Sequence, residues 1–157
     1  ALRKIKSKKN NIDVIRAALT DAAGIDEAEL TCRSILESCI LDGVTAFQKY
    51  CEGLYSKHGE APFNAFQRLE QGGELWKNAI NKTYTDWLTP EELSDLNILF
   101  QKRHLLAHND GIVDDKYIEK SKDNSYKSGQ RIVINDSDID SLLNCLIKLG
   151  DGLISAV

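Results

Sequence analysis

The sequence predicts an all-α bundle packed around one long central helix. Apolar residues recur at helical spacing through most of its 157 residues, and from Asp26 to Lys57 they cover more than one face of the expected helix. A helix that is apolar over so wide an arc must be covered by several neighbours, so this segment should be central. The run from Arg131 to Ile134 departs from the helical pattern, and a short strand or hairpin is expected near residues 131–134.

Capping residues and chain breaks divide the rest of the chain into further helices. Asn, Asp, Ser and Thr side chains cap helix starts, whereas Gly and Pro mark breaks. Helices are therefore expected between Asn10 or Asn11 and Gly24, on either side of Gly72-Gly73, from Thr89 to about His108, at residues 115–120, and from Asp136 or Ser137 onward.

The composition indicates one globular domain at residues 10–157, because 42% of the residues are hydrophobic and 28% are charged. Residues 1–9 are strongly basic and are expected to form a solvated tail or linker, with a binding arm as the alternative. The chain starts at Ala1 and contains no Met, so we expect it to be a piece of a longer protein whose further domains are partners, with a processed product as the alternative.

Cysteine usage and hydropathy indicate the compartment. Cys32, Cys39, Cys51 and Cys145 form no CxxC pair, and the first three lie in apolar stripes, which favours a reducing cytoplasm over a zinc site. No apolar run reaches the roughly 18 residues that cross a bilayer, so no membrane partner is expected.

The charge is unevenly distributed along the chain. The net charge of −4 argues against a protein that coats nucleic acid nonspecifically, because such binding needs a large excess of Lys and Arg. Residues 10–101 have a net charge of −8, whereas residues 102–131 have a net charge of +2. The distribution of charge is therefore more informative than the net charge of the whole chain.

Titratable side chains are concentrated in residues 103–110, with the sequence RHLLAHND. Thr89, Pro90 and Glu92 form a helix start with a capping box, and Asn109-Asp110-Gly111 should end that helix at about His108. On an ideal helix Arg103 falls near the centre of the apolar arc. Since an unpaired buried charge costs several kcal/mol or more, Arg103 should be paired with an acid or should face a cleft or subunit interface.

The histidines of this segment allow more than one interpretation. His104 and His108 lie four residues apart, so both imidazoles can reach a common ligand such as a phosphate. Metal binding is an alternative, with Asp110 as a third ligand, but HExxH is absent and Arg103 would place positive charge beside the ion. Trp76, Tyr84 and Trp87 can be read as a base-stacking platform, although their spacing is more typical of a core.

Arg103-x4-His108, with a polar residue directly after the arginine, resembles the R-x4-6-H signature of the HEPN superfamily. The resemblance covers the helical pattern and, specifically, residues 89–120. It implies a HEPN-like helical bundle that dimerises and acts as a metal-independent endoribonuclease without a cofactor. The position after the arginine is frequently Asn or Asp in that family, whereas here it is His104.

The resemblance also implies roles for the site residues. RNA would be cleaved by its own 2′-OH, with His108 as general acid or base, Arg103 stabilising the transition state, and His104 orienting the phosphate or the catalytic imidazole. Asn109, Asp110 and Lys102 are the expected substrate-binding residues. No metal is expected.

Arg103 and His108 lie about 140° apart on an ideal helix, so a homodimer that pairs two motifs is expected. By analogy, such a protein acts as a toxin or antiviral defence effector. The alternatives are a non-catalytic HEPN-like module that binds RNA, a nucleotide or a protein, and a helical scaffold in which Arg103 is structural.

Overall fold

The computed structural model describes residues 1–157 and is built from seven α-helices and two short 3-10 helices. The α-helices are α1 (Leu2–Asn10), α2 (Ile12–Ala23), α3 (Ile25–Tyr55), α4 (Leu69–Ile80), α5 (Pro90–His108), α6 (Asp115–Ser121) and α7 (Asp136–Ala156). The 3-10 helices are η1 (Ala65–Gln67) and η2 (Tyr84–Asp86). The expected all-α fold is confirmed.

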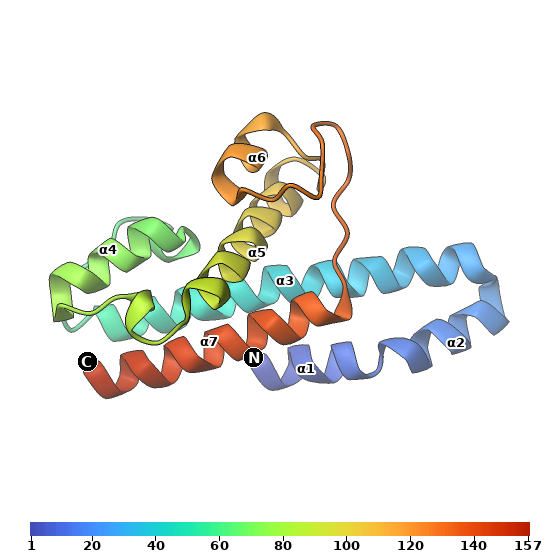
Figure 1. The fold of residues 1–157 in the computed structure, drawn as a ribbon. Helices are drawn as coiled ribbons and strands as arrows, with labels where there is room; N and C mark the ends of the chain where they lie inside the picture. The colour runs from blue at the N-terminus through green and yellow to red at the C-terminus, as the bar shows by residue number, and fades with distance from the viewer.

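Helix α3 is the centre of the bundle, as the sequence predicts. It is 31 residues long and packs against α1, α2, α5 and α7. Helices α1 and α2 form a nearly continuous rod antiparallel to α3, and α7 lies alongside α3 at the other end (Figure 1). Helix α5 leads obliquely away from α3 and α7 and meets α6 near its far end (Figure 1).

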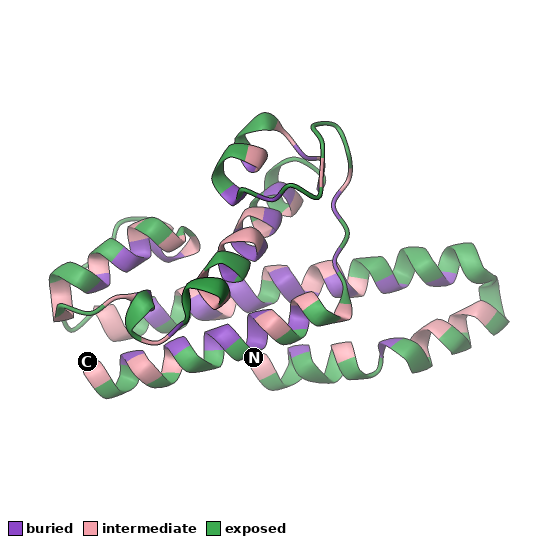
Figure 2. Ribbon diagram, viewed as in Figure 1, coloured by how far each residue is buried: buried purple, intermediate pink, exposed green.

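The core lies where α3, α5 and α7 meet. Figure 2 shows buried residues along the facing sides of α3 and α7, while the outer side of α2 is exposed. The four cysteines are buried and unpaired, and burial raises the pKa of the Cys145 thiol to about 11. They therefore pack as small apolar side chains rather than as ligands or disulfides.

The basic segment at residues 1–9, expected to be a tail or linker, is instead most of helix α1. Ile5 is only 2% exposed, because α1 packs against α3 and α7. Lys8 forms an ion pair with Asp42 at 3.2 Å, and Lys9 forms one with Asp140 at 2.9 Å. These two ion pairs help to hold the basic segment against the bundle.

Gly72-Gly73 does not separate two helices, because α4 runs through both residues. A Cβ atom at Gly72 would lie 2.6 Å from the Tyr84 hydroxyl oxygen, so the glycine allows close approach of η2 to α4. The nearby Trp76 is fully buried and Tyr84 is 3% exposed. These two aromatic side chains belong to the core and cannot form a base-stacking platform.

The strand or hairpin expected near residues 131–134 is reduced to a single antiparallel bridge between Ile112 and Arg131. The Ile132 amide donates to the Gly111 carbonyl at 2.9 Å. The ladder stops there because its partner, residues 111–113, is a short connection between α5 and α6. The segment nevertheless ties the long loop before α7 to the end of α5.

Candidate functional site

Local interactions place the histidines on the last turns of α5. The Thr89 side chain accepts a hydrogen bond from the Glu92 amide, and the Glu92 side chain accepts one from the Thr89 amide, so the expected capping box is present. At the other end Asp110 and Gly111 adopt left-handed conformations, with φ of 53° and 73°. The helix ends at His108, as predicted.

His104 and His108 come together on the exposed side of α5. Their ring centroids are 4.7 Å apart and their planes are inclined by 53°. Burial lowers the pKa of the His104 imidazole below its ordinary value, and the positive charges of His108, Lys116, Arg103 and Lys120 lower it further. At neutral pH His104 is therefore mainly the uncharged form, which can accept a proton.

Arg103 lies on the other flank of α5, partly buried and without an ion pair. Its Nε atom is buried and has no hydrogen-bond partner, and burial lowers the pKa of the guanidinium. The structural ion pair considered from the sequence is thus not formed. One chain brings the two imidazoles together but leaves Arg103 and His108 on different flanks of the helix.

Lys102, expected to bind substrate, is buried on the interior side of α5. Its ammonium donates to the Val133 carbonyl at 3.2 Å and lies 3.7 Å from an Asp138 carboxylate oxygen. It also lies 5.6 Å from the centre of the Tyr126 ring. Through these contacts Lys102 holds the loop before α7, and its ammonium group lies on a different side of α5 from the histidines.

Asn109 and Asp110 form the exposed turn beyond His108. The Asn109 side-chain amide donates to the Ile112 carbonyl at 2.7 Å, which closes the turn. Asp110 forms no ion pair, although its charge helps to raise the pKa of Arg131. No group of three or more His, Cys, Asp or Glu side chains is placed to hold a metal ion, so the histidines and Asp110 do not form a ligand set.

A polar cleft of about 660 Å³ separates η1 and the start of α4 from α5 and α6. Asn97, Gln101 and His104 line its α5 wall, and Lys116 and Lys120 line its α6 wall. His108 lies one turn beyond His104, outside the cleft lining. The sequence did not predict this cleft, and its only local signal is the spacing of the α5 side chains, which form one polar stripe.

The lining of the cleft contains equal numbers of acidic and basic side chains. Its cations are Arg68, Lys116 and Lys120, and its acids are Glu70, Glu74 and Asp114. The Asp114 carboxylate accepts the Tyr117 amide at 2.7 Å and caps α6. With His104 neutral the lining has no net formal charge, and protonation of His104 makes it positive.

Comparison with models of protein families, with curated proteins and with solved structures found no match to this chain. None of its helices is both long enough and apolar enough to cross a membrane.

Proposed function

We propose that this chain is a metal-independent endoribonuclease that acts through His104, His108 and Arg103. The proposal rests on one observation: two imidazoles lie 4.7 Å apart at the edge of a polar cleft, on the helix that also bears an arginine without an anionic partner. The resemblance of Arg103-x4-His108 to the HEPN signature points to the same chemistry.

In the proposed reaction the RNA 2′-oxygen attacks the adjacent phosphorus, and the bond from phosphorus to the 5′-oxygen of the next nucleotide breaks. His104 accepts the proton of the 2′-OH, because its lowered pKa keeps it uncharged near neutral pH. His108 donates a proton to the leaving 5′-oxygen. The products are a 2′,3′-cyclic phosphate and a free 5′-OH, and no electrons are exchanged with a cofactor.

Arg103 supplies positive charge to the pentacoordinate transition state, for which a planar guanidinium with several donors is suited. It lies about 140° around α5 from His108, so we propose that it reaches the phosphate from a second copy of the chain in a two-fold dimer. Sedimentation equilibrium should therefore give twice the 17.6 kDa mass of one chain.

Incubation with single-stranded RNA in EDTA tests the activity. Cleavage should persist in the chelator, leave cyclic phosphate ends, and fail on the same sequence made of DNA. His104→Ala and His108→Ala should each lower the rate at least about a hundredfold, the usual contribution of a general acid or base. His58→Ala, which changes the third, exposed histidine, is the matched control and should cleave normally.

A second candidate is a non-catalytic module that binds RNA or a nucleotide. The observation in its favour is the cleft lining, whose amides and balanced charges suit a ligand with one phosphate better than a polyanion. Retained RNA binding without any cleavage by the wild-type chain would select this candidate and reject the first.

The cellular setting is a further part of the proposal. We place the chain in the cytoplasm because all four buried thiols are unpaired. A role as a toxin or antiviral defence effector rests on the family resemblance alone. Growth arrest on expression of the wild-type chain, absent for His108→Ala, is the result that this role requires.

A further inference from the structure

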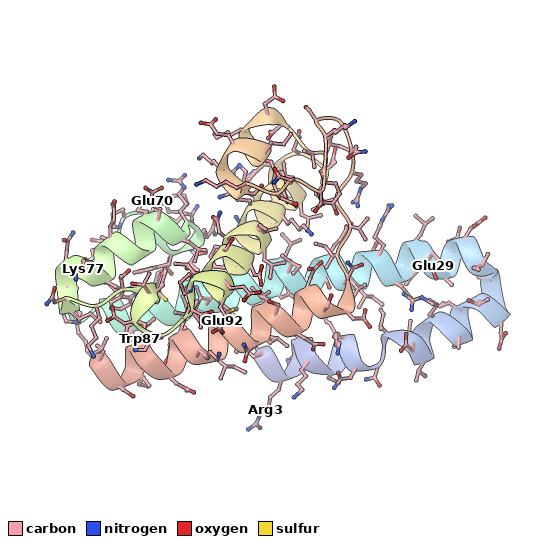
Figure 3. All side chains as sticks on the ribbon, in the orientation of Figure 1. Arg3, Glu29, Glu70, Lys77, Trp87 and Glu92 are labelled. Atoms are coloured by element: carbon pink, nitrogen blue, oxygen red, sulfur yellow. The ribbon has the colours of Figure 1, made fainter.

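The cleft between α4 and α5 holds a set of side chains that the cleavage chemistry does not use. Its volume of about 660 Å³ lies within the range of about 300–1,000 Å³ typical of small-molecule sites. Glu70, near the start of α4, lines the cleft, whereas Lys77 lies nearer the other end of that helix (Figure 3). The cleft is large enough for one nucleotide.

The α6 wall provides positive charge for a phosphate. Lys116 and Lys120 lie four residues apart on α6, line the same cleft, are exposed, and form no ion pair. Arg68, on the opposite wall, makes only a long contact of 3.5 Å with Gln71. These cations are therefore free to bind an anion, since no carboxylate of the chain neutralises them directly.

The α5 wall provides groups that suit a base. Gln101 lines the cleft and makes no side-chain hydrogen bond within the chain, so its amide can both donate and accept. Asn97 donates to the Lys120 carbonyl at 3.0 Å, which leaves its side-chain oxygen facing no donor of the chain. Phe100 and Leu105, both nearly fully buried, form the apolar floor.

The acidic wall limits where phosphate can lie. Glu70 and Glu74 line the α4 side and form no ion pair, so they repel phosphate and accept hydrogen bonds from hydroxyl or amino groups. The α6 side of the cleft therefore has a net positive charge, whereas the α4 side, where Arg68 partly offsets the two glutamates, has a net negative charge. Such a division suits a nucleoside monophosphate, with one anionic end and one neutral hydrogen-bonding end.

We propose that this cleft binds one nucleotide of single-stranded RNA, with its phosphate at Lys116 and Lys120 and its base at Gln101 and Asn97. The position of this nucleotide, directly next to the scissile phosphate, rests on the proposed function, because His104 lines the cleft and His108 lies just beyond it. The cleft then determines which base is accepted beside the cleavage point.

Calorimetric titration with the four ribonucleoside 5′-monophosphates tests the site without any cleavage. At least one should bind, more tightly than either its nucleoside or inorganic phosphate. Lys116→Ala and Lys120→Ala should each weaken binding about tenfold, and Gln101→Ala about three- to tenfold, the effects of losing a charged and a neutral hydrogen bond. Lys77→Ala removes a lysine of α4 that lies outside the cleft lining, so this variant should bind as the wild type does.

The outcomes separate this inference from the proposed function. The cleft inference is overturned if no monophosphate binds, if inorganic phosphate binds as tightly as every nucleotide, or if the three cleft variants bind like Lys77→Ala. Binding as predicted without RNA cleavage rejects the nuclease and retains the cleft. In a cleaving protein, Lys116→Ala should raise KM more than it lowers kcat, whereas His108→Ala should lower mainly kcat.

Discussion

The imidazole rings of His104 and His108 lie 4.7 Å apart on one side of α5, whereas Arg103, the residue before His104, lies on the other flank with its Nε buried and unpaired. Spacing along the helix explains both facts, because residues four apart share a face and adjacent residues do not. The motif thus presents two surfaces, and each can be tested separately.

The pKa of His104 should lie below its ordinary value of 6.5, mainly because the ring is partly buried and also because cations surround it. Its neutral form is favoured in the folded chain, so its contribution to stability is present above pH 6.5 and is lost as the pH falls through the folded pKa. The loss of folding stability at low pH should be smaller in His104→Gln by the contribution of His104, whereas His58→Ala should show the full loss. An NMR titration that places His104 at or above 6.5 would contradict this.

Arg103→Met should leave the free energy of unfolding unchanged or raise it by about 1–3 kcal/mol. The gain would come from removing one unsatisfied buried polar group, which costs that amount. The same variant should lose RNA cleavage. Arg131→Met is the matched control, because Arg131 forms an ion pair with Glu37 and its loss should lower stability by about 1–3 kcal/mol. If urea denaturation shows Arg103→Met strongly destabilised, Arg103 is structural.

Tyr117→Phe should destabilise the fold by about 1–3 kcal/mol. The Tyr117 hydroxyl donates to an Asp123 carboxylate oxygen at 2.7 Å in a buried pair, so the variant leaves the carboxylate short of a donor. Tyr50→Phe loses an exposed hydrogen bond to the Gly150 carbonyl and should cost less. If thermal unfolding shows that the two variants lose the same amount of stability, burial of the pair between Tyr117 and Asp123 is unimportant.

Asp123 should also make stability depend on pH in acid. Burial alone would raise the pKa of its carboxyl, but hydrogen bonds from Ser125 and Tyr117 outweigh burial and lower it. Its contribution is therefore present above the ordinary value of 3.8 and is lost as the pH falls through the folded pKa. The difference in stability between wild type and Tyr117→Phe should shrink when denaturation is measured below that pKa.

Gly72→Ala should destabilise the fold although it lies within a helix. The added Cβ would lie 2.6 Å from the Tyr84 hydroxyl oxygen and 3.1 Å from a Phe66 ring carbon, so packed side chains must shift. Such overpacking costs about 1–3 kcal/mol. Gly53→Ala, in α3 with no atom near its Cβ position, should instead stabilise by about 0.5–1 kcal/mol. In urea denaturation, the free energy of unfolding should therefore fall for Gly72→Ala and rise for Gly53→Ala.

Local signals made most of the helix limits predictable. Thr89 with Glu92 starts α5 and Asn109 to Gly111 ends it through hydrogen bonds that span only a few residues. The pairing of His104 and His108 is equally local, because one turn of helix joins them. The wide apolar pattern of residues 26–57 likewise identified α3 as central, since burial on several faces requires several neighbours.

Contacts between distant segments account for what the sequence analysis missed. The basic residues 1–9 resemble a tail in the sequence, but in the structure α3 and α7 bury Ile5. Lys102 resembles a surface cation in the sequence, but the loop before α7 covers it. Gly72 resembles a helix break in the sequence, but in the structure it lies within a helix and allows Tyr84 to pack closely. In each case the partner is far along the chain, so no local pattern reports it.

For this protein the sequence alone therefore determined the limits of α5, the central position of α3 and the histidine pair, because capping and helical periodicity act within a few residues. Only the tertiary structure decided that Arg103 has no acidic partner, that Lys102 faces inward, and that α4 and α6 enclose a cleft beside His104. Those features depend on which distant side chains meet, and the packing of whole helices sets that.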